Sequence, residues 1–597
     1  MIKKNKRLNA KGQTRTQILV VEAYRPGGGA DPKQRTIKNF GYLEDQDNQE
    51  EFMKMVMEFN ATFKNESDNL ISKTPMYSEE NRKLNYGYRY LESIYDALDI
   101  DKFIKDFNMS SKFKGIYSPS EIFKFLVILR IMQPDSKRAT FQLKNNYYGM
   151  NTNFNLEDVY RSLDNFVDFE IELQRHLNEK IKETIGRDLS HAFYDVTNYF
   201  FEIDFPENEY DLRQKGVSKE HRITPITSMG LFMDSNSLPV CMSIFPGNTS
   251  ESITLVPTMT DIKKSYRLGR LVIVADKGLN SSNNINEAVN NGDGFVFSQI
   301  LKGKKGQRYH DKLFDKNGWI SNKAGTYKYK LFYEEYEGID AKGKKVKRTR
   351  KVLIYWDEKD AKVARAKREE KLIKAEKNVR NNAYSIKKGV DEYTKEHIVD
   401  KQSGEVLEDI TKLRSVDLEK AEQDALYDGY FCIITSELDY DENKIREVYH
   451  GLWKIEQSFR IMKSDLYARP VFVRNNNHIR AHFLICFVAL LIVRIVQHKL
   501  GEKALSAERI ARVLNAATLK LTKNGIVELD DIGGCLAFQK IKDDEGKEVE
   551  TLRHTNKDEI AEDFKIIQKL FNTEDYYIKY KQEHFNKILK KMIVSLQ

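Results

Sequence analysis

Two aspartates, Asp195 and Asp276, lie at positions where a carboxylate could bind a metal ion or take part in catalysis. Asp195 lies in HAFYDVTNYFFEI, a run so rich in aromatic and β-branched residues that it predicts a strand buried on both faces. An ionised carboxylate there is costly unless it is paired, so either a buried Lys or Arg neutralises it or it has a metal-binding or catalytic role. Asp276 ends the apolar run RLVIVA. In sheets with helical connections, ligand groups gather at such carboxyl ends of strands.

A third acidic residue, Glu456, lies in residues 447–470, EVYHGLWKIEQSFRIMKSDLYARP, which predict a single helix. At about 100° per residue, Tyr449, Glu456, Arg460 and Lys463 fall within roughly 60° of one another, beside an apolar stripe. An ordinary i, i+4 ion pair between Glu456 and Arg460 accounts for the same pattern without any chemistry. The helix alone leaves both interpretations open.

The elements that must position these residues follow a recognisable order. Residues 189–300 predict three strands in hairpin order, then helix, strand, helix and strand, which is the order of a ribonuclease H-like domain. A basic stretch with short strand-like pieces follows, and a strand and the Glu456 helix come after it. The predicted class is therefore α/β (α+β multidomain), a ribonuclease H-like core interrupted by a strand-rich insertion.

The rest of the chain divides by composition into an N-terminal β-hairpin module, a helical domain and a helical C-terminal region. The helical domain places Lys137, Arg138 and Lys144 among tyrosines, which suits either DNA binding or a solvated helical bundle. The predicted boundaries are 1–63 for the hairpin module, 84–186 for the helical domain, 187–300 and 428–500 for the core, 301–427 for the insertion, and 501–597 for the C-terminal region.

Composition excludes several classes of protein. The four cysteines are at least 49 residues apart, which gives no zinc-finger spacing and no disulfide scaffold, and suits a reducing, intracellular compartment. The start lacks the apolar core of a signal peptide, and the longest apolar run, 483–493, is too short to cross a bilayer. Lys plus Arg number 98 against 89 Asp plus Glu, and seven cations fall within residues 342–351. That run predicts either a DNA phosphate surface or a solvated loop.

The residues together resemble a known family. Asp195, Asp276 and Glu456, 81 and 180 residues apart, are similar to the acidic trio of the DDE transposases of bacterial insertion sequences. The resemblance is to the group with the signature Tyr, two residues, Arg, three residues, Glu, six residues, Lys. Tyr449, Glu456 and Lys463 fit that spacing, whereas the arginine position holds Leu452.

The resemblance implies a catalytic and metal-binding trio of Asp195, Asp276 and Glu456. Two Mg²⁺ ions, for which Mn²⁺ would substitute, would be held by these oxygen ligands. Arg460, Lys463 and Lys277 would then contact DNA phosphates, Tyr449 would donate a hydrogen bond to a phosphate oxygen, and Trp453 would stack on an unpaired base or simply pack beneath the insertion.

The implied function is a DNA transposase that binds element ends and catalyses metal-dependent cleavage and strand transfer. The implied partners are double-stranded DNA, as terminal inverted repeats and target, and a second protomer; the location is cytoplasmic, at the nucleoid, with no membrane. Two alternatives stay open: an inactive or domesticated DNA-binding protein, and a hydrolytic nuclease of the same fold.

Overall fold

The computed structural model contains two compact units, Met1–Arg82 and Lys83–Gln597. Each unit is described by itself. The described residues are 1–8, 14–24, 33–68, 82–111, 113, 115–202, 208–217, 223–266, 269–380, 393–398, 412–522, 524–530, 532, 537–542, 548–553, 556–573, 576 and 578–592.

The N-terminal unit is a three-stranded antiparallel sheet with one helix. Strands β1 (Ile2–Leu8), β2 (Thr14–Tyr24) and β3 (Lys33–Tyr42) pair in chain order, and α1 (Gln49–Asp68) follows. Ile18 and Val20 of β2 form a small core with Phe52 and Val56 of α1. The predicted hairpin module lacked β1, because its lysines hide the strand pattern. The sequence also predicts a turn at residues 26–29 and a linker at 64–83. The turn and most of the linker lie outside the described residues.

The larger unit begins with a helical part built around one buried helix, α16 (Asn476–Leu500). Helices α4 and α6 contact it. The segment Asn476–Lys503 is long and apolar enough to cross a bilayer, but 94% of its most apolar window is buried inside the protein, as in a core helix. The remaining helices of this part are α2 (Tyr88–Ala97), α3 (Ile100–Ser110), α4 (Pro119–Met132), α5 (Lys137–Gln142), α6 (Leu156–Asp168) and α7 (Glu170–Thr184).

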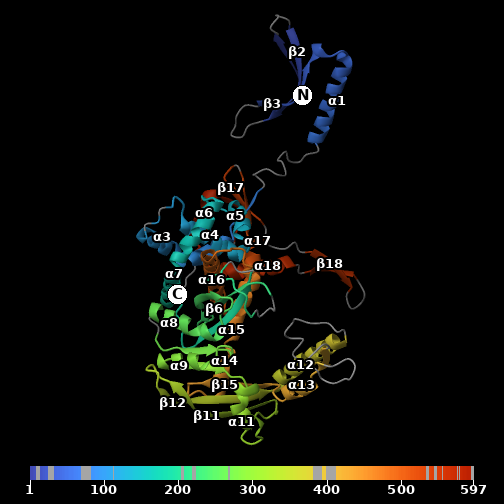
Figure 1. Cartoon of the computed structure of the whole chain (residues 1–597). Helices are drawn as coiled ribbons and strands as arrows, with labels where there is room; N and C mark the ends of the chain where they lie inside the picture. The colour runs from blue at the N-terminus through green and yellow to red at the C-terminus, as the bar shows by residue number, and fades with distance from the viewer. Residues whose placement is uncertain are drawn as a thin grey trace. The chain divides into compact units, whose positions relative to one another are not determined.

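A nine-stranded sheet forms the second part of this unit (Figure 1). Its first five strands lie in the order β7-β6-β5-β8-β9; β5, β6 and β7 are antiparallel neighbours, and β8 runs parallel to both β5 and β9. The sequence predicted this order of elements, and the structure confirms it. The bounds are β5 (Ala192–Phe200), β6 (Ile226–Met233), β7 (Pro239–Pro246), α8 (Leu255–Tyr266), β8 (Val272–Ala275), α9 (Ser282–Asn290) and β9 (Gly294–Ser298).

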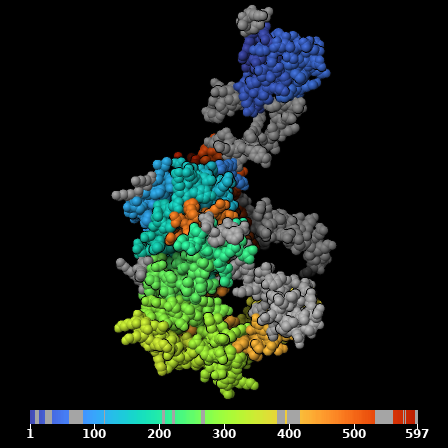
Figure 2. All heavy atoms as spheres, in the orientation of Figure 1, coloured from blue at the N-terminus to red at the C-terminus, as the bar shows by residue number. Residues whose placement is uncertain are grey.

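The inserted residues extend the same sheet. Strand β15 (Tyr430–Thr435) pairs with β9, and β12, β11 and β10 continue the sheet beyond it. In Figure 2 the yellow-green atoms of the insertion accordingly form one continuous surface with the green atoms of the first strands. The other elements of the insertion are α10 (Gly303–Gly306), α11 (His310–Phe314), β10 (Ile320–Ser321), β11 (Tyr327–Ile339), β12 (Lys345–Asp357), α12 (Glu358–Arg380), β13 (Thr394–Ile398), β14 (Lys412–Val416) and α13 (Leu418–Ala425).

The C-terminal region is not purely helical as predicted. Its strands β16 (Thr518–Leu521), β17 (Ile526–Leu529) and β20 (Lys579–Lys581) form a sheet with β4 (Lys83–Asn85), so the two ends of the larger unit pair with each other. Strands of three or four residues are too short for period-two alternation to identify them. The remaining elements are α17 (Ala507–Ala516), β18 (Ala537–Lys542), β19 (Glu548–Arg553), α18 (Asn556–Leu570) and α19 (Gln582–Lys590).

Candidate active site

The segment that carries Glu456 is two helices and a π-turn, not the single helix predicted. Helix α14 (Glu442–His450) ends at Gly451, α15 (Trp453–Arg460) begins two residues later, and a π-helical turn covers Ile461–Asp465. A Cβ atom on Gly451 would lie 2.3 Å from the ring of Phe193. The glycine therefore lets the helix junction approach β5 closely. Tyr449 and Glu456 therefore lie on two successive helices rather than on one.

Asp195 is half-buried in the middle of β5. Alternation along the strand gives Phe193, Asp195, Thr197 and Tyr199 the same face. Phe193 contacts the junction before α15, and Tyr199 donates its hydroxyl to the sulfur of Met462 at 3.6 Å. The helix that carries Glu456 therefore covers the face of β5 on which Asp195 lies.

Asp276 directly follows β8 and is also half-buried. Its Oδ1 accepts hydrogen bonds from the Ser298 hydroxyl at 2.8 Å and from the Tyr449 hydroxyl at 3.2 Å. Burial, reinforced by the negative charge of Asp276, raises the pKa of Tyr449 well above its ordinary value. Tyr449 is therefore a neutral hydrogen-bond donor to Asp276.

The two aspartates lie side by side. Strands β5 and β8 are parallel neighbours, and Phe193 pairs with Val274. Two residues further along the chain are Asp195, within β5, and Asp276, which directly follows β8, so the two residues take neighbouring positions on strands about 4.8 Å apart. The fold thus brings together two carboxylates that are 81 residues apart in the sequence.

Glu456 is the third residue of the predicted trio, and the structure gives no contact between it and either aspartate among the described hydrogen bonds and ion pairs. It is exposed on α15, which contacts β5. Within the described ranges, no three His, Cys, Asp or Glu side chains are grouped so that they could hold a metal ion. The donor chemistry of the trio still suits a hard cation, because every ligand would be an oxygen.

The comparisons with known proteins bear on this arrangement. The family described as "Transposase DDE domain" matches residues 211–492. The family described as "IS1634 family transposase, N-terminal domain" matches residues 2–69, so the two matches span more than half of the chain. The chain belongs to the DDE transposases.

The transposase has no match among curated proteins. A solved structure, described as a cryo-EM structure of a piggyBac transposase synaptic complex with hairpin DNA, matches with 9% sequence identity and a TM-score of 0.33. The match covers 66% of this chain and 69% of the other. A likeness this distant carries no argument here.

The cations predicted for DNA contact lie in different surroundings in the transposase. The Lys463 ammonium donates to the hydroxyl of Thr197 at 2.6 Å, two residues from Asp195. Lys277 and Arg460 are exposed, and the Trp453 side chain is 53% exposed, so it does not pack beneath the insertion. Leu452, at the position of the family arginine, is buried in the core.

Sequence reasoning missed Arg494, which reaches α15 from α16. Its guanidinium donates to the hydroxyl of Ser458 at 2.6 Å and to the carbonyl of Lys454 at 3.1 Å. Burial, with the nearby charge of Arg460, lowers its pKa to about 10. Arg460, Arg494 and Trp453 line one cavity of about 500 Å³. The sequence signal that could have indicated this residue is its position: Arg494 is a single charge directly after the apolar run 483–493.

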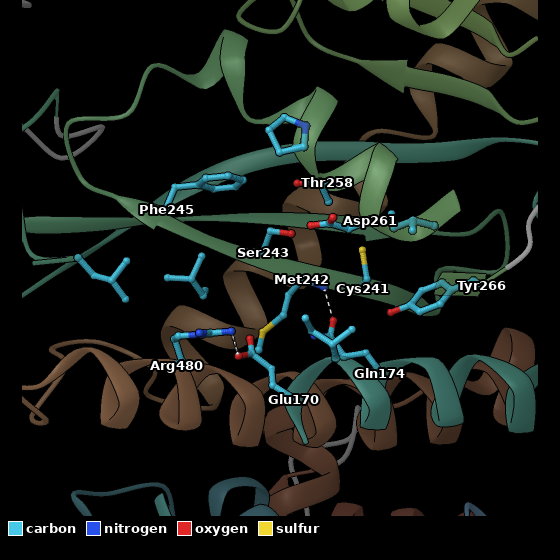
Figure 3. A pocket seen from close by; sticks show the side chains of 15 residues that line it. Glu170, Gln174, Cys241, Met242, Ser243, Phe245, Thr258, Asp261, Tyr266 and Arg480 are labelled. Carbon is cyan, nitrogen blue, oxygen red and sulfur yellow. Dashed lines mark hydrogen bonds and ion pairs between the residues drawn. The ribbon is translucent and has the colours of Figure 1, made fainter. Parts of the chain in front are cut away.

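A second cavity, of about 320 Å³, opens beside Asp276. Lys277 and Tyr449 line it, the insertion contributes Lys302 and Tyr427, and β15 contributes Tyr430. The insertion therefore forms part of the surroundings of Asp276. A third cavity, of about 340 Å³, lies along the edge strand β7 and contains none of the predicted residues (Figure 3). Arg480 and Glu170 form an ion pair of 2.7 Å on its wall.

Three of the cations in the predicted basic segments lie inside the fold, whereas Lys342, Lys344, Lys345, Lys347 and Arg138 are exposed. In the basic run, Arg350 pairs with Glu334 at 2.7 Å, and Lys351 is buried and donates to the carbonyl of Tyr440. In the helical part, Lys137 is buried in the core with its ammonium 3.3 Å from His482. Tyr147 and Tyr148 are buried as well. These side chains pack rather than form a basic surface.

Proposed function

We propose that this DNA transposase binds the ends of its own element and uses Asp195, Asp276 and Glu456 for metal-dependent DNA cleavage and strand transfer. One observation carries the proposal: Asp195 lies in β5, Asp276 directly follows the parallel neighbour β8, and α15, which bears Glu456, contacts β5. The transposase families matched by the chain support the same chemistry.

A ribonuclease H-like core is part of this proposal. The strand order β7-β6-β5-β8-β9, with three antiparallel strands and then two parallel additions, supports it. In such a core the central strand and its parallel neighbour each present a carboxylate at one place. The insertion between β9 and β15 then separates the two aspartates from Glu456 in sequence without breaking the sheet.

Each proposed residue has a role in this site. Asp195, Asp276 and Glu456 would hold two Mg²⁺ ions, or Mn²⁺ in their place. Bound there, the ions would activate the attacking oxygen and stabilise the leaving oxygen of an in-line displacement at phosphorus. Tyr449 and Ser298 fix the Asp276 carboxylate by hydrogen bonds.

The remaining side chains would hold DNA. Lys463, fixed by Thr197, would neutralise a phosphate next to the scissile bond. Arg460 and Lys277 would contact phosphates further along, and exposed Trp453 would stack on an unpaired base. Tyr449, through its place beside Asp276, would also come within reach of a phosphate oxygen. We propose that two protomers pair two element ends and act at the nucleoid in the cytoplasm.

The decisive experiment incubates purified protein with duplexes that carry the terminal repeats of its element, with target DNA and Mg²⁺. The test variants are Asp195→Asn, Asp276→Asn and Glu456→Gln. Glu447→Gln is the matched control, because Glu447 is exposed on α14 and pairs only with the surface residue Lys444 among the described contacts.

Joined products from the wild type and the control, lost in all three test variants, support the proposal. Nicked DNA that is never joined would indicate a hydrolytic nuclease. Binding of the ends without any cleavage by the wild type would overturn the catalytic proposal and leave a DNA-binding protein.

A further inference from the structure

One buried cation of the larger unit has only neutral partners. Arg494 of α16 is 6% exposed. Its Nε and Nη2 groups donate to the hydroxyl of Ser458 at 3.0 and 2.6 Å, and Nη2 also donates to the carbonyl of Lys454 at 3.1 Å. Its Nη1 group donates to the amide oxygen of Gln497 at 3.0 Å. A guanidinium has five N–H donors, so one of them has no acceptor among the described hydrogen bonds.

Arg494 shares a cavity with a second cation. Arg460, which is exposed on α15, lines the same cavity of about 500 Å³. Neither guanidinium forms an ion pair with a carboxylate in the part of the chain that the structure describes. Burial and the charge of Arg460 lower the pKa of Arg494 to about 10, so Arg494 stays positive at neutral pH and the two cations repel each other. A buried charge costs free energy unless an opposite charge lies beside it, and an anion in this cavity would supply that charge.

The other walls of the cavity leave it positive. Asp465 is the acidic residue among the described lining residues, and burial raises the pKa of its carboxyl although Arg460 opposes the shift. His498 has a pKa lowered by burial and is neutral at pH 7, so the lining carries an excess of one positive charge. Helix α17 also begins here, because Ser506 and Ala507 line the cavity. The first N–H groups of a helix lack partners within the helix and favour an anion.

The cavity lies beside the helix that carries Glu456. Arg494 bonds to Lys454 and Ser458, which are two residues before and two residues after Glu456. The Lys454 ammonium also donates to the carbonyl of Ser235, which follows β6, at 2.7 Å. Arg494 therefore connects the buried helix α16 to the part of α15 that presents Glu456.

We infer that this cavity binds a phosphate group of the DNA backbone and that the bound phosphate fixes the position of α15 through Arg494. Arg494 and Arg460 would donate N–H groups to the phosphate oxygens, because guanidinium groups form charge-assisted hydrogen bonds with phosphates. The repulsion between the two cations would then be replaced by the attraction of both to one anion. This inference rests on the proposed function, because it assumes that DNA lies along α15. Arg494 is then a positioning residue, which acts on Glu456 through the backbone of α15.

The first experiment uses the full-length protein without DNA, in a buffer without divalent cations. Pyrophosphate is the probe, because it presents phosphate oxygens without a base or a sugar. Calorimetry measures its binding, and hydrogen exchange of the backbone amides measures the stability of α15. The test variants are Arg494→Met, Arg494→Lys and Arg460→Met. Arg512→Met is the matched control, because Arg512 is exposed on α17, pairs with Glu559 and does not line the cavity.

Pyrophosphate should bind the wild type and the control equally and should slow amide exchange in α15 of both. Arg494→Met should weaken this binding by roughly ten-fold, because a hydrogen bond to a charged group is lost, and should abolish the slowing. Arg494→Lys keeps the charge and should bind with an intermediate affinity. Arg460→Met, at an exposed position, should also weaken binding, and it repeats the test if Arg494→Met changes the melting of the protein.

The second experiment distinguishes a phosphate of DNA from a free phosphate as the occupant. A terminal-repeat duplex should slow amide exchange in α15 of the wild type, and excess pyrophosphate should not slow it further. Arg494→Met should lower the salt slope of duplex binding by about one, whereas Arg512→Met should leave it unchanged. Slowing by pyrophosphate but not by the duplex would overturn the assignment to DNA and leave a site for free phosphate compounds.

No binding of pyrophosphate by the wild type, or equal effects of Arg494→Met and Arg512→Met, would overturn the inference. If cleavage depends on the three carboxylates while α15 responds to neither ligand, the proposed function stands and only the inference fails. If the wild type binds the duplex but never cleaves it, the proposed function fails, whereas the exchange measurements still test the cavity.

Discussion

The hydroxyl of Tyr449 donates a 3.2 Å hydrogen bond to the carboxylate of Asp276. This bond joins the last turn of α14 to the end of β8, so the helix that precedes Glu456 is attached directly to one of the two neighbouring aspartates. Tyr449 is bonded to Asp276 and lies seven residues before Glu456. This short stretch of chain therefore limits how far α15, which carries Glu456, can lie from the Asp276 carboxylate.

Tyr449→Phe should reduce DNA cleavage by roughly ten-fold, because a hydrogen bond to a charged group is lost while Ser298 still holds Asp276. Cleavage of labelled terminal-repeat DNA measures the effect. Tyr430→Phe is the control, since Tyr430 lines the same cavity. Equal rates for wild type and Tyr449→Phe would mean that this bond does not position Asp276 for the reaction.

Chelation should stop cleavage and leave end binding largely intact. The proposed carboxylates act through bound cations, whereas Lys463, Arg460 and Lys277 would contact DNA phosphates by their own charge. Adding Mg²⁺ or Mn²⁺ back should restore product, which gel analysis of the same reaction detects. Sustained cleavage in excess chelator would contradict a metal-dependent site.

Lys463→Gln should weaken binding of terminal-repeat DNA and lower its salt slope by about one, because one phosphate contact is lost. Binding titrations at several salt concentrations measure both effects. Lys444→Gln on α14 removes the same charge from an exposed ion pair and serves as the reference. Indistinguishable titrations for the two variants would place Lys463 in a structural role only, as the anchor of Thr197.

Gly451→Ala should lower both the melting temperature and the cleavage rate. Its new methyl group would overlap the Phe193 ring, and overpacking of this kind costs about 1–3 kcal/mol. Phe193→Leu should partly rescue the variant by making room. Thermal melting of the two single variants and the double variant tests this, and strictly additive losses would argue against the close approach.

The free energy of unfolding should depend on pH through Glu170, which lines the cavity along β7. Burial raises the pKa of this carboxyl, although Arg480 opposes the shift. Glu170 therefore increases the free energy of unfolding at pH values below its ordinary pKa of about 4.5. This contribution is lost as the pH rises through the higher pKa in the folded protein. Relative to Glu170→Gln, the wild type should lose melting temperature as the pH rises above about 4.5. A constant difference between the two proteins over this range would contradict the raised pKa.

The sequence predicted the elements whose patterns are local. The buried strand around Asp195, the strand end at Asp276 and the order of the core strands all follow from apolar runs and their limits. The break at Gly451 could not be predicted, because it depends on Phe193, which is 258 residues away in the sequence. The burial of Lys137 could not be predicted either, since its partner His482 lies on a distant helix.

The insertion is continuous with the sheet that carries the aspartates. Strand β12 pairs with β15, β15 pairs with β9, and β9 lies beside β8, which ends at Asp276. Backbone hydrogen bonds therefore link the outermost strands of the insertion to the strand that ends at Asp276, with no hinge along that line of strands. Moving the outer strands of the insertion relative to Asp276 would therefore require breaking backbone hydrogen bonds within the sheet.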